Sequence, residues 1–245
     1  MAIDLNADLG EGMDDAAILP FVTSANIACG MHAGDPETMD RTVRLALSHG
    51  IRIGAHPGYS DRANFGRVPV PMSLEAVEDL VLYQVAALDG FVRSHGGVLA
   101  HVKPHGALYN QAAENLQLAR AIAEGVRRVR QSLVLVGLSG SSLIEAGRDV
   151  GLPVAEEAFA DRRYRSDAKL VPRSRPRAVL HQPEEAADQA LMIAKHGAVL
   201  AEDGSKISLH ADTICLHGDT PGAQAIAAAI RRRLESEGLD VAPLR

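Results

Sequence analysis

The sequence of 245 residues contains no tryptophan, and its other aromatic residues are four tyrosines and four phenylalanines. Such a chain offers few rings for base stacking, and its net charge of −6 gives it no general attraction for phosphates. We therefore expect no nucleic-acid partner. Its apolar runs are too short to cross a bilayer, and its N-terminus lacks the features of a signal peptide, so we expect no membrane partner.

Cysteine is also scarce, because Cys29 and Cys215 are the only two and they form no CxxC pair. This usage fits a reducing compartment and predicts a cytoplasmic protein in which both thiols are buried rather than nucleophilic. No GxGxxG follows the first predicted strand, and no GxxxxGK[ST] occurs, which argues against the common nucleotide-binding loops. The remaining composition, 47% hydrophobic and 23% charged, is that of a globular chain with a large core.

Apolar segments typical of strands alternate with segments typical of helices. Strands are predicted at residues 3–9, 24–29, 50–56, 98–103, 133–137, 153–157 and 213–216, with a hairpin around Asp203-Gly204. Helices are predicted at residues 16–21, 36–48, 73–94, 112–130, 143–150, 182–196 and 223–237. Residues 57–72 are expected to form a long loop. The alternation predicts parallel βαβ units, as in one α/β barrel or an open sheet.

Ionisable residues recur where the predicted strands end. The eight are Asp8, His32, His56, Lys103, His105, Glu157, His217 and Asp219. In a β/α barrel, side chains at the C-terminal ends of the strands gather at one mouth, whereas an open sheet gathers them at a single crevice. Either fold makes these eight residues the candidates for an active site.

Each candidate also has a structural interpretation. Asp4, Asn6 and Asp8 alternate along the first strand, which indicates either a polar cavity or an exposed edge. Asp8 could cap a loop, Asp219 could cap the last helix, and the histidines could be ordinary loop residues. Of the adjacent pair Glu156 and Glu157, one at most faces the cavity, and we choose Glu157.

Lys103 ends a predicted buried strand and precedes Pro104, a position where a lysine has no obvious structural purpose. We expect Lys103 to hold a carboxylate, a phosphate or an oxyanion. Asp8, His32 and His56 could together bind a divalent metal ion; without one, Asp8 could act as a general base. Residues 161–177 carry six arginines and one lysine against two aspartates, which indicates an anion site, a partner contact or merely a solvated loop.

Several longer motifs resemble those of the LamB/YcsF family. They are Asp4–Glu11, Ser24–Pro36, Gly54–Gly58, Val102–Asn110, Phe159–Arg162 and Cys215–Asp219. Nearly the whole chain takes part in this resemblance. Departures from the family pattern are Ala7 in place of cysteine, Met31 in place of phenylalanine, and a shortened loop at residues 11–14, which leaves the role of Glu11 open.

The resemblance implies an irregular (β/α)7 TIM-like barrel of the glycoside hydrolase/deacetylase type, formed as a single domain by residues 1–245. It implies ATP-dependent opening of the lactam of 5-oxo-L-proline to L-glutamate, together with partner subunits B and C. Under this hypothesis Lys103 and Arg162 or Arg163 bind the anionic groups, while Asp8, His32, His56 and His105 handle water and protons. ATP would bind in a partner or at the subunit junction. The alternatives are a metal-dependent deacetylase of a carbohydrate-like amide and a non-catalytic scaffold.

Overall fold

The computed structural model describes residues 2–244, and its centre is a closed barrel of seven parallel strands. The strands, in barrel order, are β1 (Ala2–Leu9), β2 (Ser24–Ala28), β3 (Arg52–His56), β4 (Leu99–Val102), β5 (Val134–Leu138), β6 (Val154–Phe159) and β9 (Thr213–His217). The barrel closes because β9 pairs with both β6 and β1. The prediction of an irregular (β/α)7 TIM-like barrel is therefore confirmed.

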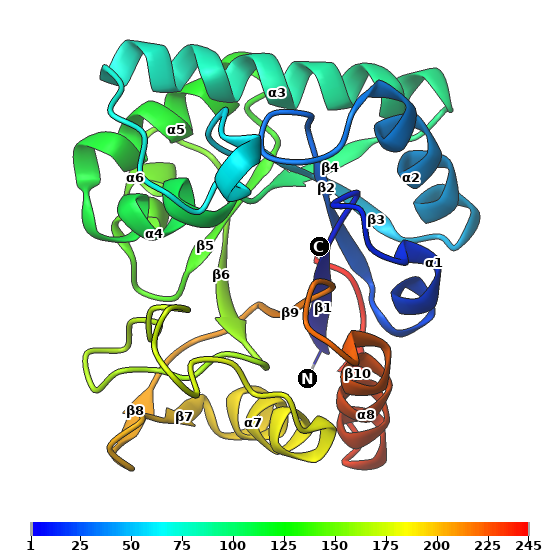
Figure 1. Ribbon diagram of the computed structural model, residues 1–245, viewed down its shortest axis with the longest axis vertical. Coiled ribbons are helices and arrows are strands. Elements are labelled where there is room, and N and C mark those ends of the chain that lie inside the picture. Colours follow the sequence, from blue (N-terminus) through cyan, green and yellow to red (C-terminus); the bar gives the residue numbers. More distant parts are fainter. Residues whose placement is uncertain (1, 245) are drawn as a thin grey trace.

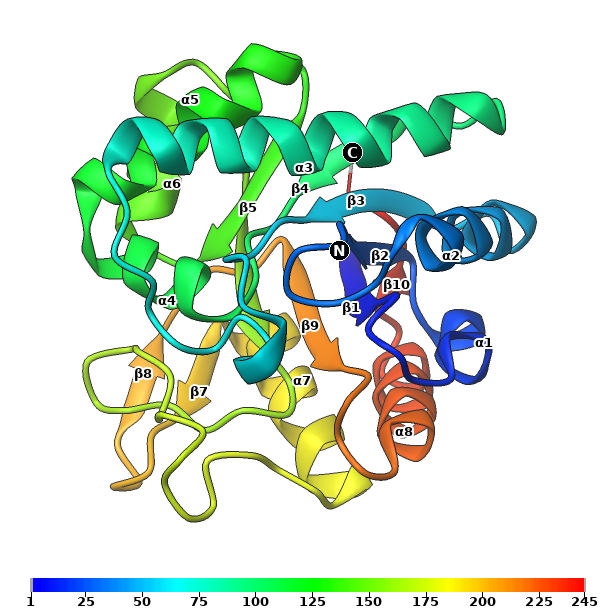
Figure 2. The same cartoon turned by 45° about the horizontal axis from the view of Figure 1, so that its top comes forward.

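Helices surround this barrel (Figure 1). They are α1 (Asp15–Ile18), α2 (Pro36–Ser48), α3 (Leu74–Ser94), α4 (Gly106–Glu114), α5 (Leu116–Val129), α6 (Ser142–Asp149), α7 (Pro183–His196) and α8 (Ala223–Ser236). In Figures 1 and 2, α3 runs along one side of the molecule, whereas α7 and α8 lie together on the opposite side. The hairpin of β7 (Ala198–Leu200) and β8 (Lys206–Ser208) lies outside the barrel, and the short β10 (Asp240–Val241) extends β1.

The prediction of one helix over residues 112–130 was wrong. Two helices, α4 and α5, cover residues 106–129, and Asn115 separates them with an extended backbone (φ −121°, ψ 101°). The Asn115 side chain accepts hydrogen bonds from the backbone N–H of Gln117 (3.0 Å) and Leu118 (3.1 Å), so it caps α5. The loop at 57–72 was predicted correctly, except that it contains a 3₁₀ turn at Arg62–Asn64.

The polar face of β1 points into the barrel, which excludes the exposed-edge interpretation. Asp4, Asn6 and Asp8 are all buried. Asn6 Nδ2 donates to Glu157 Oε1 (2.9 Å), and Asn26 Nδ2 donates to Asn6 Oδ1 (2.7 Å) and to Asp8 Oδ1 (2.9 Å). The barrel interior is therefore a hydrogen-bonded polar column that leads to the C-terminal ends of the strands, while the apolar residues of β1 face the helices.

Candidate active site

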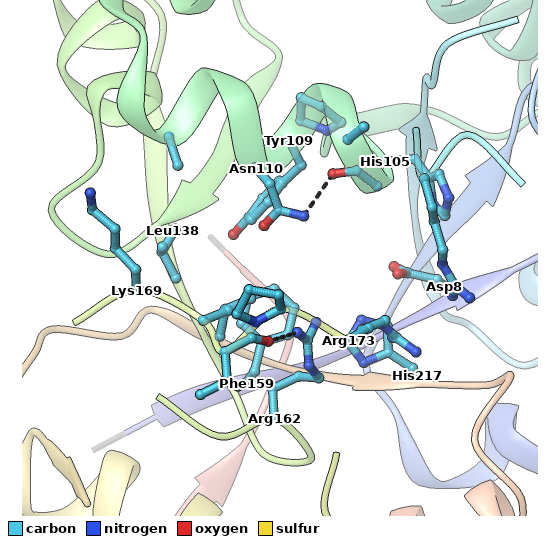
Figure 3. A pocket seen from close by; sticks show the side chains of 18 of the residues that line it. Asp8, His105, Tyr109, Asn110, Leu138, Phe159, Arg162, Lys169, Arg173 and His217 are labelled. Carbon is cyan, nitrogen blue, oxygen red and sulfur yellow. Dashed lines mark hydrogen bonds between the residues drawn. The ribbon is translucent and has the colours of Figure 1, made fainter. Parts of the chain in front are cut away.

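A cavity of about 490 Å³ opens at the C-terminal ends of the barrel strands. Asp8, His56, Lys103 and His217 reach it from β1, β3, β4 and β9 or from residues directly after them. Figure 3 shows Asp8 and His105 on one side of the cavity and Lys169 on the opposite side. Side chains from distant parts of the sequence thus meet at one mouth, in a volume typical of small-molecule sites.

Lys103 is buried between two carboxylates. Its Nζ lies 3.0 Å from Asp8 Oδ1 and 3.0 Å from Glu157 Oε1, and it donates to Cys215 Sγ at 2.9 Å. Burial alone would lower the pKa of Lys103, but the charge of Asp8 and its other neighbours hold that pKa well above its usual range. Burial alone would also raise the pKa of Asp8, yet His56 and Lys103 hold it well below its usual range. Both groups are therefore charged at neutral pH.

Glu157 lies beneath the cavity and supports Lys103 from inside the barrel. It is fully buried, and its Oε2 accepts a hydrogen bond from the Tyr109 hydroxyl at 2.8 Å. Glu156 points the other way, where it accepts hydrogen bonds from Arg148 (2.9 Å) and the backbone N–H of Gly140 (2.9 Å). The structure thus places Glu157 on the inner face, although it does not line the cavity itself.

Three histidines surround the carboxylate of Glu11. Glu11 Oε1 lies 3.0 Å from His32 Nε2, 3.2 Å from His105 Nδ1 and 3.8 Å from His56 Nε2. Burial lowers the pKa of His32 to about 4 and lowers that of His105. Burial would also lower the pKa of His56, but Asp8 raises it. Glu11, His56 and His105 line the cavity, whereas His32 lies behind them and does not.

His217 is held by Asp161. The Nδ1 of His217 lies 2.9 Å from Asp161 Oδ1, and its backbone N–H donates to Asp161 Oδ2 at 3.0 Å. This contact fixes the proton of the neutral ring on Nδ1 and leaves Nε2 with a lone pair, as in the acid–base pairs of many hydrolases. Because His217 lines the cavity, the pair can exchange a proton with a bound molecule.

Asp219, which was also predicted in the site, does not line the cavity. Its Oδ2 pairs with Arg67 (2.5 Å) and Arg173 (3.6 Å). The alternative interpretation, that Asp219 caps the last helix, was wrong, because the residue at the start of α8 is Gly222. Asp219 instead holds two arginines that line the cavity.

The basic segment at residues 161–177 forms one wall of the cavity, so the interpretation as a merely solvated loop was wrong. Arg162, Arg165, Lys169 and Arg173 line the cavity. Arg162 donates to the backbone oxygen of Val171 at 2.6 Å, and burial and the charge of Arg173 lower its pKa to about 10. The segment therefore gives the cavity a positive rim.

Arg163 does not belong to that rim. Its side chain turns away toward Glu185, 4.0 Å from the carboxylate, and it does not line the cavity. Of the two arginines expected to contact anionic groups, Arg162 alone lines the cavity.

Of the three metal ligands expected from the sequence, His32 and His56 belong to a group of possible ligands that the structure brings together, whereas Asp8 lies outside that group. Glu11, His32, His56 and His105 present ligand atoms within 4.8 Å of one another. A second group of Asp8, Cys215 and His217 meets the same distance limit. Lys103 Nζ contacts both Asp8 and Cys215 in that second group, so its ammonium charge disfavours a metal ion there.

The sequence analysis did not select Tyr109 or Arg67 for the site. It left the role of Glu11 open, and it included Asp161 and Arg173 only as members of the basic segment at residues 161–177. Glu11 and Asp161 each lie two residues after the end of a strand, β1 and β6 respectively, so the pattern that identified the other strand-end residues also applied to them. No comparable signal existed for Tyr109, which reaches Glu157 from α4, or for Arg67, which lies in the long loop after β3. Their positions depend on tertiary packing.

The fold and the site define a TIM-like α/β barrel with a deep, charged cavity at the C-terminal ends of its strands. Among residues 2–244, no helix combines the length and the apolar character that a membrane crossing requires. The model of the LamB/YcsF family matches residues 3–245, and the chain belongs to this family.

The chain is similar to curated proteins that are named as the A subunit of 5-oxoprolinase. The relative from Methylococcus capsulatus is 52% identical, over 99% of this chain and 95% of the relative. That from Pyrococcus furiosus is 48% identical, over 100% and 98%. A crystal structure of a lactam utilization protein from Thermus thermophilus is 44% identical, covers 99% of both chains and gives a TM-score of 0.93. These matches cover the whole barrel.

Proposed function

We propose that this chain is the A subunit of an ATP-dependent 5-oxoprolinase, a single-domain cytoplasmic protein that opens the lactam of 5-oxo-L-proline with partner subunits B and C. The observation that carries the proposal is the full-length similarity to curated proteins of that name. The name of the similar Thermus protein, which refers to lactam utilization, points to the same substrate class. The chemistry of the cavity supports it independently.

The cavity suits a small anionic lactam. Arg67, Arg162 and Arg173 line its wall, and they provide a site for the substrate carboxylate. Lys103 lines the same cavity, and its ammonium group can bind the oxygen of the lactam in exchange for one of its present acceptors, such as Cys215 Sγ. The substrate would then lie with its reactive carbon close to Asp8 and His217.

Activation by ATP gives a balanced reaction. The γ-phosphoryl group of ATP is transferred to the lactam oxygen, and ADP leaves. A water molecule adds to the activated carbon, and the carbon–nitrogen bond breaks as the nitrogen takes a proton, which leaves a ring-opened acyl phosphate. A second water releases inorganic phosphate and gives glutamate. Lys103 stabilises the negative charge on oxygen, and the His217–Asp161 pair accepts the proton of the attacking water.

A division of labour between subunits follows from the absence of a phosphate-binding loop motif in the sequence. We place ATP in one of the partners or at its junction with this chain, where its phosphates would face the positive rim of the cavity. Subunits B and C would thus supply the phosphate-binding motif that this chain lacks.

The test is the release of glutamate from 5-oxo-L-proline and ATP, with and without subunits B and C. We expect activity in the complete complex, and a loss of about 100-fold or more for Lys103→Ala, because an oxyanion-stabilising contact is removed. Lys195→Ala is the control, since Lys195 pairs with Glu237 on the surface (2.7 Å). Full activity of Lys103→Ala would contradict the role of Lys103. Activity of the isolated chain on an N-acetylated sugar without ATP would contradict the proposed function and support a deacetylase.

A further inference from the structure

Two histidines at the edge of the cavity direct lone pairs at each other. The Nδ1 of His56 lies 2.7 Å from the backbone oxygen of Lys103, and the Nε2 of His105 lies 2.8 Å from the backbone oxygen of Phe65. A carbonyl oxygen accepts only, so each of these nitrogens carries the ring proton. The other nitrogens, His56 Nε2 and His105 Nδ1, are therefore both unprotonated in the neutral rings, although they lie 2.9 Å apart.

Carboxylate oxygens converge on the same point. Glu11 Oε1 lies 3.2 Å from His105 Nδ1 and 3.8 Å from His56 Nε2, and Asp8 Oδ2 lies 3.3 Å from His56 Nε2. With neutral rings and ionised carboxylates, all four of these atoms are acceptors. Such a group is stable only with a shared proton or a bound cation at its centre.

The geometry points to a cation: we propose that Glu11, His56 and His105 bind one divalent transition-metal ion, with Zn²⁺ as the best match. Two imidazoles and one carboxylate are a ligand set of catalytic zinc sites. Metal–ligand bonds of about 2.0–2.1 Å in tetrahedral geometry place neighbouring ligand atoms about 3.3–3.4 Å apart. The separations of 2.9, 3.2 and 3.8 Å bracket that value.

His32 has a different role in this site. Its ring is stacked on His105, with centroids 3.8 Å apart and planes within 4° of parallel. A metal ion lies near the plane of an imidazole that binds it, so one ion cannot lie in both of these parallel planes. His32 Nε2 instead lies 3.0 Å from Glu11 Oε1, where a ring N–H orients the carboxylate. The site thus differs from the set of Asp8, His32 and His56 expected from the sequence.

The proposed site is open toward the cavity. Glu11, His56 and His105 all line it, whereas His32 closes the site from behind. Asp8 lies on the open side, but it is paired with Lys103 at 3.0 Å and is not needed as a ligand. Three protein ligands with a free position are typical of catalytic rather than structural metal sites.

The backbone also leaves room for these rings. A Cβ atom added at Gly58 would lie 2.7 Å from His32 Nδ1, and one added at Gly66 would lie 2.8 Å from His32 Cβ and 3.1 Å from His105 Cδ2. Both glycines belong to the long loop after β3. The loop can pack closely against the histidine rings at these two positions because glycine has no side chain. The loop carries the carbonyl of Phe65 that fixes the tautomer of His105.

The test is metal binding by the full chain, which does not depend on the proposed function. We expect Zn²⁺ or Co²⁺ to bind the chelator-treated protein with a stoichiometry of one, measured by calorimetry and metal analysis, and Co²⁺ to give the visible absorption of a tetrahedral or five-coordinate site. We expect Glu11→Gln and His105→Ala to weaken binding by more than about 100-fold. His32→Ala should keep the stoichiometry and weaken binding about 10–100-fold, as for a residue that orients a ligand. His49→Ala, an exposed histidine, should bind like the wild type.

Circular dichroism of each variant separates loss of binding from loss of folding, and the Co²⁺ spectrum of the unmodified protein needs no variant at all. A wild-type protein that binds no Zn²⁺, Co²⁺ or Mn²⁺ would overturn the proposal and favour a shared proton between the two rings. Unchanged binding by both Glu11→Gln and His105→Ala would also overturn it, because the ion would then lie elsewhere. Neither result would bear on lactam opening.

Discussion

Lys103 shows how one residue determines the charge balance of the site. A buried ammonium between Asp8 and Glu157 neutralises only one of two negative charges, and hydrogen bonds from Asn26 and Tyr109 support the two carboxylates. When one partner of a buried ion pair is removed, the other charge stays buried without a counter-charge. This lowers stability far more than replacing the whole pair by apolar residues. Lys103 is thus important for folding as well as for binding an anion.

We therefore expect Lys103→Met to lower the free energy of unfolding by about 3–5 kcal/mol. The double variant Lys103→Met/Glu157→Gln should recover part of this loss, because it removes one of the uncompensated charges. Urea unfolding at pH 7 measures both. Equal stability of Lys103→Met and wild type would show that the two carboxylates do not depend on Lys103.

The carboxyl group of Asp161 makes the stability of the protein depend on pH. Burial alone would raise the pKa of this carboxyl, but its contacts with His217 lower it below the usual value of 3.8. Its stabilising effect is therefore fully present above about pH 4 and is lost as the pH falls through the lower, folded-state value.

We expect Asp161→Asn to lose about 1–3 kcal/mol of unfolding free energy at pH 7, since hydrogen bonds to a charged group are weakened. The difference from wild type should shrink as the pH falls below about 4. Urea titrations between pH 7 and pH 3 test this, and a difference that grows toward low pH would contradict the assignment.

At the scale of elements, close packing between β3 and β4 fixes the position of the polar column. A Cβ added at Gly54 would overlap the ring of His101, whose Nε2 lies 2.8 Å from Asn26 Oδ1. The register between β3 and β4 shifts at this glycine. Gly54 thus makes room for a buried histidine inside the barrel.

We expect Gly54→Ala to destabilise the protein by about 1–3 kcal/mol through overpacking. Gly90→Ala is the matched control, because Gly90 lies within α3 and nothing among the described residues stands within 4 Å of its added Cβ. That control should be neutral or stabilising by up to about 1 kcal/mol, from helix propensity. Thermal unfolding compares the two, and equal behaviour would show that the contact with His101 is easily relieved.

Periodicity and turn residues were sufficient to predict the strands of the barrel, since a parallel strand buried on both sides has a clear apolar signature. The boundary between α4 and α5 was not predictable in the same way. The apolar residues on either side of Asn115 keep a helical spacing, which hid the boundary, although asparagine is a favoured N-cap residue and Asn115 caps α5. Glu11 and Asp161, which follow β1 and β6, could have been predicted as site residues because they lie close to strand ends. Tyr109 and Arg67 could not, because only the tertiary structure brings them to the site.

At the scale of the whole molecule, barrel closure is what makes a site from scattered residues. β1 pairs with both β2 and β9, so Asp8 and His217, from opposite ends of the sequence, stand side by side as strand neighbours. The basic segment after β6 and the loop after β3 both contribute residues to the lining of the cavity at the mouth of the barrel. The outcome is one cavity with a positive rim and a polar interior.

The central claim is that this cavity binds the lactam. A crystal structure of the assembled complex with 5-oxo-L-proline and a non-hydrolysable ATP analogue tests it most directly. We predict that the ring lies in the cavity, with the lactam oxygen about 3 Å from Lys103 Nζ and the carboxylate against Arg67, Arg162 or Arg173. Substrate bound in one of the partner proteins, with this cavity filled only by water, would contradict the account.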